Sequence, residues 1–480
     1  MPPVVVVSLV LSPAIYLTGR WLAAGARAAT LAALGILWLV FGLAMRDLDL
    51  AGTLVDRLGG VAFYFDGLSL LITAVVLFLS TLVTLYSGPD IRGKTGEEKY
   101  YAMLLLLSGG VIGLVSAGDL FNLWIWFEMT AISSYLLVAF HRERGDTLAA
   151  CAKYLIQTAS GSILVLFGIA LVFAQTGTLD LAHTQAAPSP LIAVAGAFLV
   201  IGFGVKIALA PTYTWLPDAY SQAPGGISAL LSGIVTISGL AALLRALALL
   251  DGLAVEWGAV LIGFGTVNIV IGNLLALRQD SVKRIFAYSS VSHIGFVLLA
   301  VGIGVYAGQP AGFISGMLHL FIHALMKALA FLAVGAASYT RHRTDSTLRV
   351  GDLAGLAGRE PLLAAALIIA CLSLAGVPPL AGFMSKWLIF DAGLRVGGAT
   401  MVLLVIFAAL NSVFSLAYYF PIVNALFRTE LEPPQRALPT AMQLPVVILT
   451  GALLVVGIYP ALLDAFVNPA AQALLNLFGS

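Results

Sequence analysis

The stretch SGMLHLFIHALMKALAFLAVG, residues 315–335, is an apolar run that carries three titratable side chains spaced four residues apart. These are His319, His323 and Lys327. A helix places positions i, i+4 and i+8 on one face, so the three side chains form a stripe about 12 Å long at about 1.5 Å per residue. An apolar run of this length is typical of a helix that crosses a bilayer.

Similar apolar runs recur along the whole chain, in which 60% of the residues are hydrophobic and only 10% are charged. A bilayer-spanning helix needs about 20 mainly apolar residues. The sequence therefore predicts an all-α membrane protein of about fourteen transmembrane helices, several of them long enough to tilt, break or re-enter. The candidates lie near 3–19, 26–45, 62–87, 101–117, 119–140, 148–175, 190–222, 225–250, 256–277, 282–304, 309–338, 361–394, 400–427 and 441–470.

The basic residues give an independent test of this topology. When the loops are assigned alternately to two sides, sixteen Lys and Arg residues fall on the side opposite the N-terminus. The other side has only Arg46, Arg57, Arg245 and Arg395. Cytoplasmic loops carry the excess of basic residues. We therefore expect a multi-pass protein of the inner (cytoplasmic) cell membrane with both termini on the non-cytoplasmic side.

Two of the predicted helices contain proline beside a lysine. Lys206 is followed by Pro211 and Pro217, and Lys386 follows Pro378 and Pro379. Proline inside a helix kinks or breaks it, and broken backbone within a membrane is tolerated where it lines a hydrated cavity. Matched breaks in two halves of a chain point to an inverted-repeat transporter.

The breaks lead to a predicted domain organisation, with an inverted five-helix repeat in each half. Residues 1–100 would hold helices one to three, 101–250 the first repeat (helices four to eight), 251–428 the second repeat (helices nine to thirteen), and 429–480 the last helix.

Glu128 lies in the apolar string FNLWIWFEMTAISSYLL, with no counter-charge within one helical turn. Its partner must come from another helix, and Lys206 is the natural candidate. A lysine beside a carboxylate keeps its charge, whereas burial without that contact favours the neutral amine. Making and breaking the Glu128–Lys206 contact would make Lys206 take up and release a proton. The alternative is a neutral carboxylic acid that serves packing alone.

Lys386 and the histidine stripe are the other candidates for ion movement. Histidine titrates near physiological pH and can relay protons. Lys386 is expected to act as Lys206 does, and the alternative is a lysine that extends to the membrane surface. Further relay candidates are Lys153, His293, Thr236 and Ser238.

Several polar residues have simpler explanations. Lys153, Lys283 and Arg284 begin helices on the predicted cytoplasmic side, where their positive charge is sufficient reason for them. Asp66 and Asp119 are typical of carboxylates that start helices.

Other classes of function are disfavoured. A net charge of +1 argues against nucleic-acid binding. The spacing of Cys151 and Cys371 suits neither a metal site nor an iron–sulfur cluster, and no phosphate-binding glycine motif stands between a strand and a helix. We expect no cofactor and no metal in this chain, so energy would come from a partner or from an opposing ion gradient. Whether the chain is a subunit of a redox enzyme stays open.

Four long strings carry a resemblance to a known family. They are VKIALAPTYTWLPDAYSQAPGGISALLSG (205–233), RQDSVKRIFAYSSVSHIGFVLL (278–299), HLFIHALMKALAFLAVGA (319–336) and LSLAGVPPLAGFMSKWLIF (372–390). Together they resemble the antiporter-like subunits of respiratory complex I and its relatives over roughly residues 60–430. The string FNLWIWFEMTAISSY is most similar to the D subunit of Mrp-type sodium/proton antiporters and to its counterparts in membrane-bound hydrogenases.

The resemblance implies a hydrated axis of ionisable residues along the membrane midplane. Its members here would be Glu128, Lys206, His319, His323, Lys327 and Lys386. The implied function is proton translocation within a multisubunit Mrp-type cation/proton antiporter, driven by switching of charge pairs along this axis. The alternative is a proton-pumping subunit of a complex I-like NADH:quinone oxidoreductase or of a membrane-bound hydrogenase complex.

The implied partners are other membrane subunits, the lipid bilayer and protons, and sodium transport stays open. A stand-alone carrier of an organic solute is a further rival, which a linear string of Lys, His and Glu disfavours.

The sequence departs from the family at one position. The family usually has a second lysine in the eighth helix, in a stretch resembling ALLSGIVTISGLAALLR, where this chain has Ile237. Either water held by Thr236 and Ser238 bridges the gap, or this half-channel works differently from its relatives.

Overall fold

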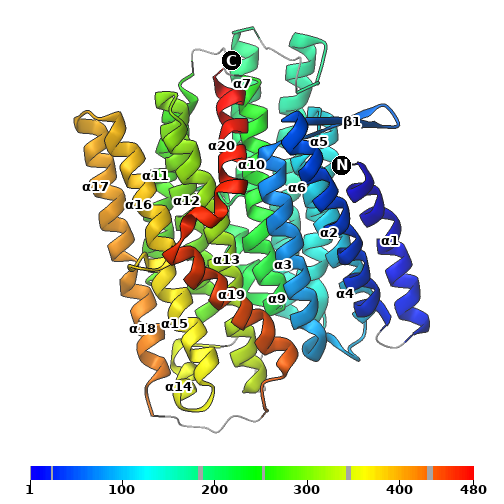
Figure 1. Cartoon of the computed structure of the whole chain (residues 1–480), viewed down its shortest axis with the longest axis vertical. Helices are drawn as coiled ribbons and strands as arrows, with labels where there is room; N and C mark the ends of the chain where they lie inside the picture. Colours follow the sequence, from blue (N-terminus) through cyan, green and yellow to red (C-terminus); the bar gives the residue numbers. More distant parts are fainter. Residues whose placement is uncertain are drawn as a thin grey trace.

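The computed structural model describes residues 2–22, 25–181, 187–250, 255–341, 348–429 and 436–479. These residues fold into a bundle of helices packed side by side (Figure 1). Its only sheet within the described residues is an antiparallel hairpin of β1 (Leu54–Leu58) and β2 (Val61–Phe65), in which Leu54 pairs with Phe65. The prediction of an all-α membrane protein is confirmed.

The helices follow one another with few long connections. The first part of the chain contains α1 (Pro2–Trp21), α2 (Gly25–Ala51), α3 (Gly67–Ile91), α4 (Glu97–Val115), α5 (Leu120–Val138) and α6 (Gly145–Thr176). The first broken region contains α7 (Pro190–Lys206), α8 (Leu216–Gln222), α9 (Gly225–Leu230), a π-helical turn (Leu231–Val235) and α10 (Thr236–Ala248).

The second half of the chain has the same helical character. It contains α11 (Trp257–Ala276), α12 (Val282–Ala307), α13 (Pro310–Thr340), α14 (Leu356–Arg359), α15 (Pro361–Ala375), α16 (Ala381–Val396), α17 (Ala399–Phe414), α18 (Leu416–Leu426), α19 (Thr440–Ile458) and α20 (Asp464–Phe478).

Thirteen helices of the described chain are long and apolar enough to cross a membrane, and α7 and α15 are shorter apolar helices. The last predicted helix, 441–470, is divided into α19 and α20 by a short 3₁₀ turn at Pro460–Leu463. Taking α7 with α8, α15 with α16 and α19 with α20 as one broken helix each gives fourteen candidate crossings among the described residues, as predicted. Accordingly, α1 begins and α20 ends toward the same end of the bundle (Figure 1). Which side of the membrane that end faces stays a prediction from the basic residues.

The first predicted break is real and is held by side chains from other elements. Helix α7 ends at Lys206, and Asn268 of α11 binds the backbone that follows. Its Oδ1 accepts from the Ala210 N–H at 2.8 Å, and its Nδ2 donates to the Ala208 carbonyl at 3.2 Å. The Trp215 indole donates to the Val205 carbonyl at 2.7 Å. Broken backbone inside a membrane requires such partners.

The second predicted break separates α15 from α16. Gly376 ends α15 with a φ of +85°, a left-handed conformation that glycine adopts at little cost. The Gly382 N–H, at the start of α16, donates to Ser373 Oγ at 3.1 Å. Both halves of the chain thus contain a helix broken beside a lysine. The repeat boundaries themselves remain a prediction.

Helix α13 lies at the centre of the bundle. All residues in its most apolar stretch are buried, and the same is true of α9–α10. In α1 and α17–α18 only 28% of the residues in the corresponding stretch are buried. Outer helices that expose apolar side chains are suited to contact with lipid or with other membrane subunits. The titratable stripe of α13 therefore lies in the best-shielded part of the protein.

Candidate functional site

Lys206 is the last residue of α7 and is fully buried. Its Nζ donates to the Phe127 carbonyl at 3.4 Å and lies 4.8 Å from the centroid of the Phe127 ring. Its stem packs on α10 at Gly239, where an added Cβ would come within 2.9 Å of Lys206 Cγ. Glycine at this point therefore allows α7 and α10 to approach closely around the lysine.

Glu128, on α5, follows Phe127, the residue whose carbonyl Lys206 contacts. The predicted contact between Glu128 and Lys206 is not made in this structure, because the ammonium binds backbone instead. Glu128 Oε1 is buried and has no hydrogen-bond partner among the described residues. Because Glu128 directly follows Phe127 in α5, it is near Lys206 without forming an ion pair with it. The structure therefore shows the two groups as neighbours in an open arrangement.

A hydrogen-bonded line joins three helices in the second half of the chain. His293 Nδ1 of α12 lies 3.1 Å from His319 Nε2 of α13, and His319 Nδ1 lies 2.8 Å from Ser385 Oγ of α16. The two imidazole rings stack with their centroids 5.2 Å apart. An imidazole can accept at one nitrogen and donate at the other, so this line can carry a proton between His293 and Ser385, the residue that precedes Lys386 in the chain.

His323 lies on the same face of α13 but outside this line. Its ring stacks on His293 at 5.5 Å, and both ring nitrogens are buried without a hydrogen-bond partner among the described residues. His323 is therefore close to His293 but takes no part in the hydrogen-bonded line among the described residues.

Lys327 is fully buried and forms its hydrogen bonds with α12 rather than with the histidines. Its Nζ donates to the Phe286 carbonyl at 2.8 Å and to Ser289 Oγ, both on α12. Ser289 Oγ is also hydrogen-bonded to the Tyr419 hydroxyl of α18. The predicted stripe of α13 is therefore divided between two hydrogen-bonding networks.

Lys386 is 2% exposed and does not reach the membrane surface. Its Nζ donates to the Leu374 carbonyl at 2.8 Å and to Ser412 Oγ at 2.9 Å, and lies 4.9 Å from the centroid of the Phe296 ring. The alternative of a surface-reaching lysine is therefore wrong. The ammonium binds the last turn of α15, where the helix dipole favours a positive charge.

Lys153 and Arg284 share one carboxylate at the first break. Lys153 Nζ lies 2.7 Å from Asp218 Oδ2, and Arg284 Nη1 lies 2.6 Å from Asp218 Oδ1. Asp218 belongs to α8, which follows the break. Lys153 therefore contacts the broken segment from α6, and its role as a relay residue remains a prediction.

Sequence reasoning missed two buried cations. Lys283, explained from the sequence as a cytoplasmic charge, is fully buried and donates to the Ala223 carbonyl at 2.6 Å. Arg245, counted as a loop residue, is 4% exposed and binds Asp66 with both oxygens within 2.9 Å. Only the position of Arg245 within an apolar run could have suggested burial. Asp66 also starts a helix as predicted, because it accepts from the Ser69 N–H.

Asp119 starts α5 as predicted, since its side chain accepts from the Asn122 N–H at 2.7 Å.

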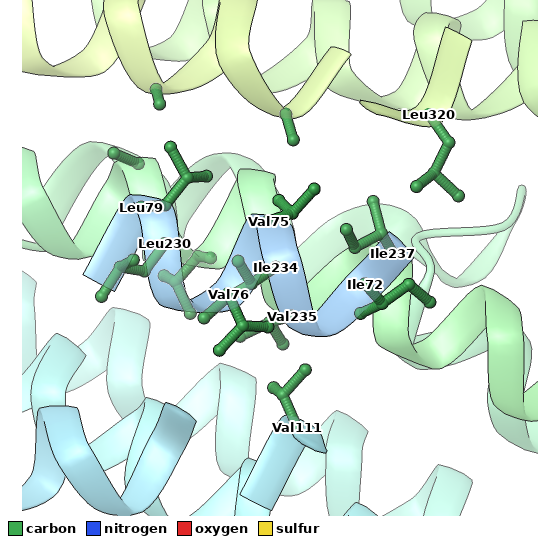
Figure 2. Close-up of a cluster of buried hydrophobic side chains, with 14 of the residues drawn as sticks. Ile72, Val75, Val76, Leu79, Val111, Leu230, Ile234, Val235, Ile237 and Leu320 are labelled. Atoms are coloured by element: carbon green, nitrogen blue, oxygen red, sulfur yellow. The ribbon is translucent and has the colours of Figure 1, made fainter. Parts of the chain in front are cut away.

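Ile237, the position at which the resemblance implied a lysine, has an aliphatic environment. Ile237 is fully buried in a cluster that includes Ile72 and Val75 of α3 and Leu320 of α13 (Figure 2). Ser238 Oγ donates back to the Val235 carbonyl of its own segment at 2.8 Å. The predicted role of Ser238 in ordering water at this point therefore has no support in the geometry.

The sequence profile of the family described as "NADH:quinone oxidoreductase/Mrp antiporter, TM" matches residues 117–415, a range that includes both broken helices and the buried lysines. The chain belongs to this family. Two relatives show how fully the likeness extends along the chain. The NADH-quinone oxidoreductase subunit N of Desulforudis audaxviator is 30% identical, with 83% of this chain and 82% of that protein covered. The F(420)H(2) dehydrogenase subunit N of Methanosarcina mazei is also 30% identical, covering 86% and 84%.

Three solved structures have the same fold as this chain. A chain of the archaeal membrane-bound sulfane sulfur reductase superposes with a TM-score of 0.89 at 28% identity, covering 99% of this chain and 97% of that one. A chain of the Mrp complex from a Dietzia species gives 0.87 at 25% identity, covering 99% and 98%. A chain of respiratory complex I from Thermus thermophilus gives 0.78 at 29% identity, covering 96% and 98%.

Proposed function

We propose that this chain is a proton-translocating membrane subunit of a complex I-like respiratory complex. The two relatives described above are subunits N of electron-transferring complexes, one named for NADH and quinone and the other for F(420)H(2). They favour the redox-driven alternative over the Mrp-type antiporter that FNLWIWFEMTAISSY first indicated. The likeness to the Mrp complex is a likeness of fold, which both kinds of assembly share.

The observation that carries the proposal is the line from His293 through His319 to Ser385, the residue that precedes Lys386 in the chain. Burying three imidazoles and four lysines in one bundle costs free energy. A hydrogen-bonded line across α12, α13 and α16 connects the centre of the bundle to the second broken helix. Packing alone does not require such a line.

The first half of the chain supplies a switch for this line. When Glu128 and Lys206 move together, the carboxylate stabilises the ammonium, and when they separate the buried ammonium loses that support. Lys206 then releases its proton toward the second half, and Lys386 passes a proton out at the second break. The open Glu128–Lys206 arrangement corresponds to the releasing state of this cycle.

Purification of the complex through a tag on this chain tests the proposal. We expect iron-containing subunits to copurify, and we expect the complex in proteoliposomes to move protons when electrons flow to a quinone analogue. Copurification of iron-free membrane subunits alone, with sodium-dependent proton exchange, would instead assign the chain to an Mrp-type antiporter. Loss of proton movement in Lys386→Ala ties the activity to this chain.

A further inference from the structure

A cavity of about 1000 Å³ opens between the α3–α4 connection, the first turns of α4 and the end of α5. It lies at the end of the bundle away from the two chain termini (Figure 1). The basic residues predict that this end is cytoplasmic. Ligand-binding cavities have volumes of about 300–1,000 Å³, so this one has room for a ligand. The buried lysines and histidines described above do not line it.

Tight turns form both walls of the cavity. In the α3–α4 connection, Gly93 and Gly96 have φ angles of +75° and +91°, which glycine adopts at little cost. Glu97 Oε2 accepts from the Gly93 N–H at 2.8 Å, so this carboxylate is bound within the connection. On the opposite wall, α5 is followed by a 3₁₀ turn at Ala139–His141. The two turns bring charged residues from separate connections to one cavity.

The charges around the cavity are mainly positive. The charged residues that line it are Lys94, Lys99, Arg142 and Glu143. Lys94 is paired with Asp90 at 2.8 Å, and Glu143 lies 3.4 Å from His141 Nδ1. Lys99 and Arg142 are exposed and form no ion pair with any residue of the described chain. Two positive charges are therefore available for an anionic ligand.

The rest of the lining is apolar and continues toward the membrane. Met103 of α4 and Leu136 of α5 line the cavity, together with the Tyr100 and Phe140 rings, which pack edge-on with centroids 5.2 Å apart. Leu136 is 48% exposed. Ile132, one turn earlier on the same face of α5, is 42% exposed. An apolar surface thus extends from the cavity along a membrane-spanning helix.

We propose that this cavity binds one anionic phospholipid from the leaflet at this end of the bundle. Lys99 and Arg142 hold the phosphate group, and an acyl chain lies along Leu136 and Ile132. A guanidinium binds phosphate oxygens through two parallel hydrogen bonds, and basic pockets between membrane helices on the cytoplasmic side bind lipid head groups. A soluble phosphate would use the two cations but not the apolar surface beside them.

Photo-crosslinking in the tagged complex tests the site. The complex is placed in phosphatidylcholine nanodiscs that contain a small fraction of phosphatidylglycerol with a diazirine near the start of one acyl chain. We expect crosslinks on the peptides that contain Met103 and Leu136. Added phosphatidylglycerol without a diazirine should reduce these crosslinks, whereas added phosphatidylcholine or glycerophosphoglycerol, the soluble head group, should not.

Lys99→Gln combined with Arg142→Gln removes both free cations and leaves the apolar surface intact. Arg278→Gln combined with Arg428→Gln is the matched control, because these two arginines are exposed, lie on the same predicted side and do not line the cavity. We expect crosslinking at the cavity to fall at least about tenfold in the first variant and to keep its wild-type level in the second. Copurification of the other subunits verifies that both variants assemble.

Four outcomes would overturn the site. Equal crosslinking by diazirine-labelled phosphatidylcholine would show that the charge is not recognised, and so would wild-type crosslinking in Lys99→Gln with Arg142→Gln. Competition by glycerophosphoglycerol as strong as by the intact lipid would assign the cavity to a soluble anion. Absence of lipid crosslinks, with another subunit crosslinked to these peptides, would assign it to a protein partner. None of these measurements depends on proton movement, so the site is tested independently of the proposed function.

Discussion

Lys386 Nζ lies 2.8 Å from the carbonyl oxygen of Leu374, in the last turn of α15. The broken helix thus provides its own binding site for the ammonium, because its free terminal carbonyls are acceptors without partners in the helix. The negative end of the helix dipole adds to this attraction. The break and the lysine are therefore one functional unit.

Lys386→Ala is expected to abolish proton movement while the complex still assembles, because the variant removes the ammonium that is bound at the second break. The measurement is dye-reported acidification in proteoliposomes, with copurification of the other subunits as the assembly check. Arg395→Ala is the control, since Arg395 forms an exposed pair with Asp391 on the same helix. Normal acidification by Lys386→Ala would remove this lysine from the mechanism.

Glu128→Gln is expected to impair proton movement more than Glu128→Asp. Glutamine has the size of glutamate but no charge, so it cannot stabilise the Lys206 ammonium when the two groups approach. Aspartate keeps the charge on a shorter side chain. Initial rates of proton movement for the three proteins test this order. If Gln matches wild type, no charge pairing is needed at this position.

His319→Ala and Ser385→Ala each interrupt the line toward Lys386. Proton transfer by a positioned side chain contributes about 10²–10⁴-fold to a rate, so we expect flux through the line to fall by at least about tenfold in either variant. Ser338→Ala, on the same helix as His319, is a suitable control because its hydroxyl only binds Val334 of its own helix. Equal fluxes in Ser338→Ala and His319→Ala would show that the line is not used.

Ile237→Lys is expected to prevent assembly. The site is aliphatic, and a charged side chain there costs about 2.5–3.5 kcal/mol or more. Ile237→Met keeps the apolar character and should remain active. Membrane abundance of the tagged chain is the measurement. An abundant and active Ile237→Lys protein would show that water reaches this position and that a lysine can be used there.

Asp66→Asn is expected to lower stability by about 3–5 kcal/mol, because it leaves the buried Arg245 guanidinium without its counter-charge. Replacing both partners, as in Asp66→Asn with Arg245→Met, should recover much of the loss. Thermal unfolding of the purified complex measures both effects. Equal melting temperatures for wild type and Asp66→Asn would mean that this ion pair contributes nothing.

The sequence predicted the membrane helices from hydrophobicity and the two helix breaks from proline. Apolar runs located the membrane helices, and Pro211 and Pro379 located the breaks beside Lys206 and Lys386. These features depend on neighbours in the chain. The division at Pro460 within the last predicted helix was missed, because the residues on both sides of it are apolar enough to read as one membrane helix.

Contacts between distant helices could not be predicted in the same way. Ser385 became a partner of His319, and Arg245 a partner of Asp66, only through packing that brings separate segments together. The counting of basic residues placed Arg245 in a loop because it considers charge and not burial. The string FNLWIWFEMTAISSY favoured an Mrp-type assembly, but it lies in a membrane helix of a fold that both kinds of assembly share. The partners of a subunit depend instead on its outer surface, which this string does not describe.

The amide of Asn268 has one further consequence. Asn268 lies on α11, in the predicted second repeat, and its amide hydrogen-bonds to the backbone on both sides of Leu209. Lys283, from α12 of the same repeat, holds the carbonyl of Ala223 beyond the end of α8. The segment between Ala208 and Ala223, in the predicted first repeat, is therefore hydrogen-bonded near both ends to side chains of the predicted second repeat. A displacement of α11 or α12 would therefore also displace the segment that follows Lys206.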